Sequence, residues 1–211
     1  MNIKKTNDKN WEKVAVLCLV FGMSFSALAD NKLKNIVDVA EIDYRKTLLQ
    51  AESGDPEAQT NLGSRYIDGY EVYQDYDKAF MWFKKAADQG YPEGQYHIAL
   101  MYSNGESIQS NESEAFKWFK LSADQGFDYA SLQVGIRYLQ GVGVNKNYKE
   151  SLRWLKIAAD QNIGDAQLYL GVMYFSGEGV PENKAIAKKY FAEGCTNHST
   201  KSCSLFIQIG E

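Results

Sequence analysis

One stretch of this sequence is written three times at a fixed distance. It reads FMWFKKAADQG at 80–90, FKWFKLSADQG at 116–126 and LRWLKIAADQ at 152–161. When the chain is shifted by 36 residues against itself, further columns align, including Tyr66, Tyr102, Tyr138 and Tyr174 and the glycines Gly69, Gly105, Gly141 and Gly177. Four copies are present, beginning near Gly54, Gly90, Gly126 and Asn162. A fixed period of this length is the signature of a repeat architecture.

Each copy is predicted to be a pair of helices. In the first copy, a helix over 56–68 has residues four apart that share one face, namely Ala58, Leu62 and Tyr66. Gly69 then supplies the left-handed C-cap, because a residue without Cβ takes a positive φ cheaply. A second helix is predicted over 75–89, and its apolar side is formed by Ala79, Phe83 and Ala86.

A lone hairpin of this kind cannot bury its apolar side, but a stack of hairpins can. The predicted fold class is therefore all-α, an α/α superhelical solenoid with four 36-residue repeats and a cap at each end. The recurring tyrosine, tryptophan and phenylalanine are expected to pack the core rather than to hold a ligand, because stacking needs them in every copy. The expected segments are an N-terminal capping helix over 30–50, the repeats over 51–194 and a C-terminal capping helix over 195–211.

The first 29 residues have the features of a secretory signal peptide. Lysines precede a run without charges over 14–29, which is shorter than the ~20 residues that a membrane-spanning helix needs. Ala27 and Ala29 provide a small-x-small cleavage site before Asp30. An uncleaved membrane anchor is the alternative. Lipoprotein processing at Cys18 is disfavoured, because Leu17 stands where a small residue is expected.

Charge and composition exclude several functions. Cleavage would remove four lysines and two acidic residues, which changes the formal net charge from −4 to −6. A mildly acidic chain without a Lys/Arg run repels phosphate backbones, so no nucleic-acid partner is expected. The two histidines, His97 and His198, lie far apart, so no metal or cofactor site is predicted.

Three segments carry a resemblance to a known family. AQTNLGSRYIDG, SLQVGIRYLQGVGV and AQLYLGVMYFSGEGV, each followed by text similar to A..WF.KAADQG, resemble the Sel-one-like repeats, which are related to the tetratricopeptide repeats. The resemblance covers about residues 51–195. Glu71 and Ser107 depart from it, because Gly143 and Gly179 stand at these loop positions in the later copies, so the first two loops are expected to bend differently.

Two cysteines remain after residue 29, and we expect them to form a disulfide. Cys195 falls in the column of Ala87 and Cys203 in the column of Gln95, which places them across a tight turn between helices. In an exported chain an even number of cysteines favours a disulfide. Free thiols are the alternative. The spacing of eight also resembles the cysteine pairs of secreted members of the family, but only the last unit has one here.

A partner surface is predicted on the side of the first helices opposite the packed side. In the solenoids that the family resembles, first helices line the concave surface. We define the first-helix face by four positions per repeat, starting with Glu57, Asn61, Ser64 and Asp68. The later copies bring apolar, aromatic and adaptable polar residues to it, and the predicted binding residues are His97, Leu100, Tyr129, Gln133, Ile136, Tyr169 and Val172. The alternative is that curvature buries these residues between neighbouring first helices.

Two further expectations concern polar residues. His97 is expected to make a solvent-exposed polar contact rather than to act as a general base. Arg65 and Arg137 stand in a column that is Met101 and Met173 elsewhere, and a solvated edge is expected for them, with pairing to an acidic partner as the alternative.

The function predicted is that of an exported scaffold, periplasmic or secreted, that binds another protein and catalyses nothing. The resemblance implies adaptor roles, so the partner would be an envelope protein, a secreted effector or a host protein. One alternative is a periplasmic immunity protein that neutralises a toxic effector. Another is an enzyme that binds or hydrolyses β-lactams, as implied by cysteine-rich relatives, but no S-x-x-K, S-D-N and K-T-G set can be assembled from this sequence.

Overall fold

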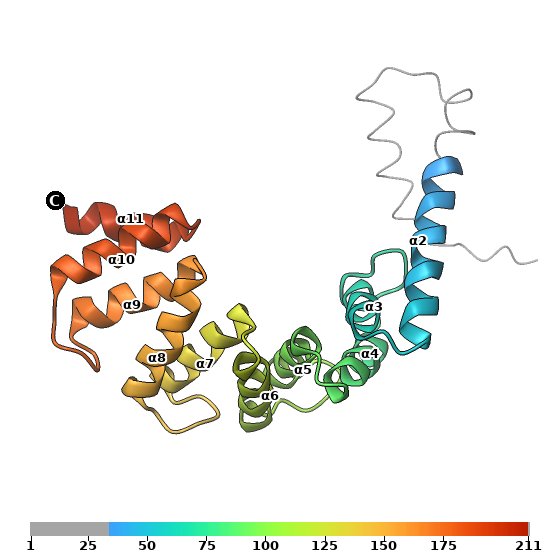
Figure 1. The fold of residues 1–211 in the computed structure, drawn as a ribbon, viewed down its shortest axis with the longest axis horizontal. Helices are drawn as coiled ribbons and strands as arrows, with labels where there is room; N and C mark the ends of the chain where they lie inside the picture. The colour runs from blue at the N-terminus through green and yellow to red at the C-terminus, as the bar shows by residue number, and fades with distance from the viewer. Residues whose placement is uncertain (1–33, 211) are drawn as a thin grey trace, which may run out of the picture. The chain divides into compact units, whose positions relative to one another are not determined.

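The computed structural model describes residues 34–210, so the predicted signal peptide lies outside the described residues. All regular structure in this range is helical, which confirms the all-α prediction. The helices are α2 (Lys34–Glu52), α3 (Pro56–Asp68), α4 (Tyr76–Asp88), α5 (Pro92–Asn104), α6 (Glu112–Asp124), α7 (Asp128–Gln140), α8 (Tyr148–Asp160), α9 (Gly164–Ser176), α10 (Lys184–Thr196) and α11 (Thr200–Gly210) (Figure 1).

The chain divides into two units, Met1–Lys46 and Thr47–Glu211. In the first unit the structure describes the beginning of α2. In the second unit each helix from α3 onward packs on the next one along the chain, and α9 also contacts α7 and α11. Because α3 also contacts α5, the contacts join helices of the same repeat or of adjacent repeats, as in the solenoid of helical hairpins that the 36-residue period predicts.

Short polar residues and glycines set the ends of these helices. The second helix of every repeat has an N-cap side chain whose oxygen accepts a hydrogen bond from a backbone N–H 3.0–3.1 Å away, at Asp75, Asn111, Asn147 and Asn183. Every first helix ends in a left-handed glycine, at Gly69, Gly105, Gly141 and Gly177. Because these signals recur with the period, the helices of all four repeats have the same length, 13 residues.

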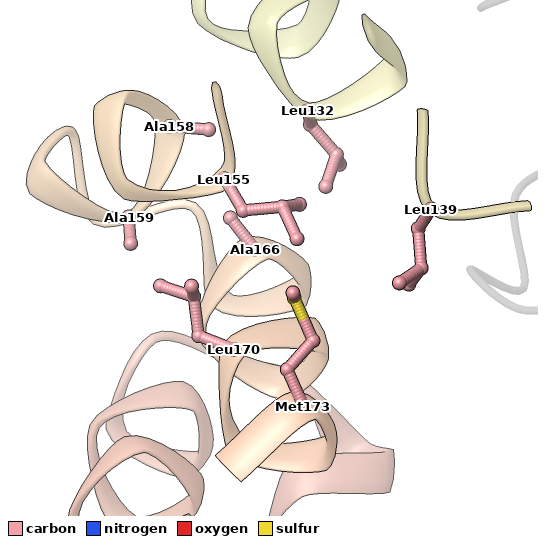
Figure 2. Close-up of a cluster of buried hydrophobic side chains, with 8 residues drawn as sticks. All are labelled: Leu132, Leu139, Leu155, Ala158, Ala159, Ala166, Leu170 and Met173. Carbon is pink, nitrogen blue, oxygen red and sulfur yellow. The ribbon is translucent and has the colours of Figure 1, made fainter. Parts of the chain in front are cut away.

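Small residues let the two helices of a hairpin approach closely. A Cβ on Gly63 would lie 2.6 Å from the ring of Phe83, and one on Gly171 would lie 2.5 Å from the ring of Phe191. In these two repeats the first helix therefore has no side chain where the second helix inserts a phenylalanine ring. Figure 2 shows the result around α8, where side chains of α7, α8 and α9, including Leu155, point toward a common core.

The prediction that the first two loops bend differently is wrong. Glu71 and Ser107 have φ values of 61° and 66°, close to the 70° and 75° of Gly143 and Gly179. The loop backbone is thus the same in all four repeats, and two non-glycine residues adopt the left-handed conformation. Contacts hold them there: Glu71 pairs with Arg65, and the Ser107 hydroxyl donates to Asp77.

The two end segments occupy positions in the repeat register. α2 ends at Glu52, which is 36 residues before the end of α4 at Asp88, so it corresponds to a second helix. α11 begins 36 residues after α9 and corresponds to a first helix. Its side chains Leu205, Phe206 and Ile209 pack on the cluster around Phe191. Cys195, where the C-terminal capping helix was predicted to begin, lies within α10, and the last helix begins later, at Thr200.

Candidate functional site: the first-helix face

The first-helix face comes about because each first helix buries one side against its own second helix. In α7 the buried side includes Ala130, Val134 and Arg137, and in α9 it includes Ala166, Leu170 and Met173. The predicted binding positions lie between these residues on the helix, which leaves them the side away from the second helix. Their exposure decides how much of this side a partner can reach.

The structure places most of the seven predicted residues at intermediate depth. Tyr129 is exposed, with 54% of its surface accessible, and it is the most open of the seven. The other predicted residues are half-buried: His97, Leu100, Gln133, Ile136, Tyr169 and Val172. On this face only part of each side chain is accessible, and the rest packs between repeats.

The half-buried residues pack on three different clusters. Leu100 lies against the core around Phe119, and Ile136 and Tyr169 lie against the core around Leu170. Val172 lies against the cluster of Phe191 and α11. These contacts agree in part with the alternative that such residues are buried between neighbouring helices. Substituting them would disturb stability as well as binding.

Aromatic rings gather where the face passes from α5 to α7. The ring centroid of Tyr96 lies 5.2 Å from that of Phe127 and 6.4 Å from that of Tyr129. Phe127 and Tyr129 are 6.1 Å apart, and Tyr96 also meets Phe119 at 5.5 Å. Burial raises the pKa of the Tyr96 hydroxyl. Tyr129 is thus the accessible end of a packed aromatic group, whose neighbours fix its position.

His97 does not make the solvent-exposed contact that the sequence suggested. Its ring stacks on Phe83 with centroids 4.4 Å apart and an interplanar angle of 7°, and its edge faces Tyr96. Burial lowers the pKa of His97 to about 4, and the charge of Asp68 only partly opposes this. At neutral pH His97 is therefore an uncharged, half-buried part of the aromatic group.

The expectation of a solvated edge is wrong for Arg137, which is only 6% exposed. Its guanidinium pairs with Glu112, donates to the Ser103 hydroxyl over 2.9 Å and lies 4.7 Å from the ring centroid of Phe119. Arg65, in the same column, is half-buried and pairs with Glu71 of its own loop. Both arginines are therefore engaged within the chain.

Cys195 and Cys203 form a disulfide, as predicted. The bond joins α10 to the start of α11, so the turn between them is closed covalently as well as by packing.

One recurring contact was missed in the sequence. Gln59, Gln95 and Gln167 each donate to a carbonyl eight residues earlier and accept from an amide 30 residues later, on Gln89, Gln125 and Asn197. These hydrogen bonds between side-chain amides connect the end of one second helix to the end of the next one. A buried glutamine recurring in three of four copies was the available signal, because a core position seldom holds an uncharged polar residue unless it is bonded.

Metal sites and membrane-spanning helices are two other kinds of functional element. Within the described range, no three His, Cys, Asp or Glu side chains come together in a way that could hold a metal ion. None of the helices described is both long and apolar enough to cross a bilayer.

Solved structures with similar folds include proteins built from the same repeat. One is a protective antigen present in uropathogenic Escherichia coli strains and displaying an SLR fold, with 34% identity, a TM-score of 0.73 and coverage of 76% of this chain and 34% of that chain. A Sel1 repeat protein from Oxalobacter formigenes has 30% identity, a TM-score of 0.71 and coverage of 73% and 63%. This chain thus spans about a third and under two thirds of their lengths.

A more distant structure shares the fold alone. An immunity protein from Pseudomonas aeruginosa has 22% identity, a TM-score of 0.56 and coverage of 96% of this chain and 69% of its own. No curated protein matches this sequence.

The family model for the Sel1 repeat matches residues 56–91, 92–127, 128–163 and 164–199 without a gap. These matches begin at or near the starts of α3, α5, α7 and α9, so the repeats of the family coincide with the hairpins of the structure. They fill more than half of the sequence, and the chain belongs to the Sel1 repeat family.

Proposed function

We propose that this chain is an exported scaffold that binds another protein through the first-helix face. Sel1 repeat solenoids are of the protein-interaction scaffold type and are generally without catalytic activity. The observation that carries the proposal is Tyr129. It is an exposed aromatic residue held by Tyr96 and Phe127, at a position where the other repeats have Glu57, Glu93 and Asp165. Rigid, exposed tyrosines are typical anchors of protein interfaces.

The residues around Tyr129 support a protein partner. Gln133 lies one turn further along α7 and offers an amide that can donate and accept hydrogen bonds. Ile136 adds a half-buried apolar edge after another turn. An aromatic anchor, an adaptable amide and an apolar edge on one helix provide the apolar core and polar rim of an interface.

Export is the second part of the proposal. The run without charges over 14–29 and the small-x-small site before Asp30 support it. The disulfide between Cys195 and Cys203 fits an oxidising compartment. If export is correct, the mass of the protein recovered from the envelope of its host will correspond to a chain that begins at Asp30, and an unprocessed chain in the cytoplasm will contradict it.

Affinity capture tests the binding face. The full chain, expressed in its host and carrying a C-terminal tag, should retain one stoichiometric protein, and Tyr129→Ala should lower the yield about tenfold or more. Leu121→Ala is the matched control, because Leu121 is 49% exposed but lies on α6, a second helix. Equal capture by wild type and Tyr129→Ala, with unchanged thermal midpoints, would refute this face.

The identity of the retained protein decides a narrower form of the proposal. A toxic enzyme whose activity falls when the chain is added would support the immunity role. A protein with no toxicity would leave the scaffold role and remove the immunity role.

A further inference from the structure

The loop that joins α3 to α4 (Figure 1), residues 69–75, has exposed aromatic side chains that the first-helix face does not include. Tyr73 is 93% exposed and Tyr70 is 61% exposed, and Tyr76 follows at the start of α4. The other three loops have no tyrosine at the positions of Tyr70 and Tyr73, where they have Glu106, Val142 and Glu178, and Gln109, Asn145 and Pro181. Repeat packing therefore does not explain these tyrosines.

The loop holds its tyrosines in a fixed arrangement. The backbone N–H of Tyr70 donates to Arg65 over 3.0 Å, and that of Asp75 donates to Tyr66 over 3.0 Å. The Gln74 amide donates to the carbonyl of Ile67 over 2.8 Å and to the Tyr76 hydroxyl over 3.1 Å. A partner that meets these rings would not have to order the loop, so little affinity is lost to its entropy.

Carboxylates surround this aromatic surface. The Ser107 hydroxyl of the second loop donates to Asp77 at the start of α4, so the first and second loops are neighbours. The stretches 65–78 and 101–114 together contain seven carboxylates, Asp68, Glu71, Asp75, Asp77, Glu106, Glu112 and Glu114. They contain two cations, Arg65 and Lys78, and two more, Lys117 and Arg137, pair with Glu114 and Glu112 from outside, which leaves an excess of three carboxylates. The equivalent stretch 137–150 has three cations and one carboxylate, and 173–186 has one cation and two carboxylates, so the acidic excess is largest at the first two loops.

Two tyrosines of this repeat, Tyr70 in the loop and Tyr66 in α3, already contact cations within the chain. The guanidinium carbon of Arg65 lies 5.8 Å from the ring centroid of Tyr70, and the ammonium of Lys78 lies 5.3 Å from that of Tyr66. The ring of Tyr73, which is almost fully exposed, can take a cation on its faces. Carboxylates nearby would attract that cation and hold its charge.

We propose that Tyr70 and Tyr73 form a second binding surface, for an arginine- or lysine-rich segment of a partner protein. The aromatic faces would receive the cationic side chains, and the carboxylates of the first two loops would supply the long-range attraction. This surface is separate from Tyr129, so either proposal can fail without the other.

Fluorescence anisotropy with a labelled deca-arginine peptide tests the proposal on the full chain. The double variant Tyr70→Ser/Tyr73→Ser should bind about fivefold to thirtyfold more weakly than wild type, because two exposed cation–π contacts are lost. Tyr73→Phe keeps the ring and should bind within about twofold of wild type. Phe175→Ser, at an aromatic residue of α9 that is 43% exposed and lies outside both the loop and the first-helix face, is the control for non-specific attraction to the acidic chain and should also stay within about twofold.

Three outcomes overturn the proposal. The first is undetectable binding of deca-arginine to wild type at low salt. The second is equal binding by wild type and the double serine variant, both folded by circular dichroism. The third is tighter binding of an uncharged probe, chitohexaose, that is lost in the double variant, which would make the tyrosines a carbohydrate platform. The proposal is supported if the double serine variant binds deca-arginine more weakly and the other two variants bind it as wild type does.

Discussion

The first and third repeats have the same two helices of 13 residues and the same loop backbone, but different contacts join them to their neighbours. In repeat one, Gln59 takes part in the amide chain and Arg65 pairs with its own loop. In repeat three, Ser131 replaces the glutamine, and Arg137 reaches Glu112 of the preceding repeat. Neighbouring repeats can therefore be joined either by hydrogen bonds between amide side chains or by an ion pair, as long as the small and large residues of the core are kept.

The two repeats also differ on the first-helix face. Repeat one presents Glu57, Asn61, Ser64 and Asp68, whereas repeat three presents Tyr129, Gln133, Ile136 and Gln140. Since the face of repeat one is polar, its packing does not need apolar residues there. Ile136 of repeat three packs on the core, but Tyr129 leaves half of its surface open although it contacts Tyr96 and Phe127, which is why we propose binding at that part of the face.

The largest effect is expected where repeat three depends on a buried charge. Glu112→Ala would leave the guanidinium of Arg137 buried with only the Ser103 hydroxyl, and we expect a loss of roughly 2–3 kcal/mol in the free energy of unfolding. Arg137→Met copies Met101 and Met173 and leaves Glu112 to solvent, so it should be near neutral or stabilising. Urea denaturation of both variants measures the difference, and equal losses would show that the pair does not act as described.

His97 should make the free energy of unfolding depend on pH, whereas its counterparts in the other repeats, Asn61 and Gln133, do not titrate. Its pKa falls from 6.5 to about 4 on folding, so the unfolded chain binds the proton more readily. The stability contributed by neutral His97 is complete above pH 6.5 and is lost as the pH falls toward 4. Between about pH 7 and pH 4, wild type should lose roughly 2–3 kcal/mol more than His97→Gln. Parallel stability curves for the two proteins would show that His97 has the same pKa in the folded and the unfolded chain, which contradicts the lowered pKa.

The smallest effect is expected from restoring the missing glutamine of repeat three. Ser131→Gln should rebuild the amide chain with Gln161, in the place of the pair Gln95 and Gln125, and stabilise by about 1 kcal/mol. Gln161→Ala introduced together with it should remove the gain, whereas Ser131→Ala has no amide to offer. The thermal midpoints of wild type, Ser131→Gln, Gln161→Ala and the double variant form a double-mutant cycle, and a coupling energy of zero would argue against the hydrogen-bonded chain of amides.

The fold could be read from the sequence because it depends on residues that repeat. Gly63 and Phe83 recur in type every 36 residues, and the period alone fixes their pairing. The positive φ of Glu71 could not be read, because its loop conformation is imposed by Gly69, by the Arg65 pair and by the hydrogen bonds that close the loop. The residue type at one loop position predicted the loop conformation less well than the register of the two flanking helices did.

The candidate site was less predictable than the fold. The first-helix positions follow from 100° per residue, but whether they are open depends on how far neighbouring helices cover them. Tyr129 remained accessible, whereas the ring of His97 turned onto Phe83, a residue on another helix that spacing alone could not place next to it. The loop tyrosines were missed because they break the repeat, and columns of like residues reveal only what is shared.

The bond between Cys195 and Cys203 has a consequence for how the molecule comes apart. A stack whose members touch only their neighbours frays from its ends, because a terminal helix has fewer contacts than an internal one. Closing a loop of eight residues removes freedom from the unfolded chain worth roughly 2–3 kcal/mol. The oxidised chain therefore keeps α11 packed on Phe191 more firmly than the reduced chain does. The stability of this end of the solenoid thus depends on the redox state of the compartment around it.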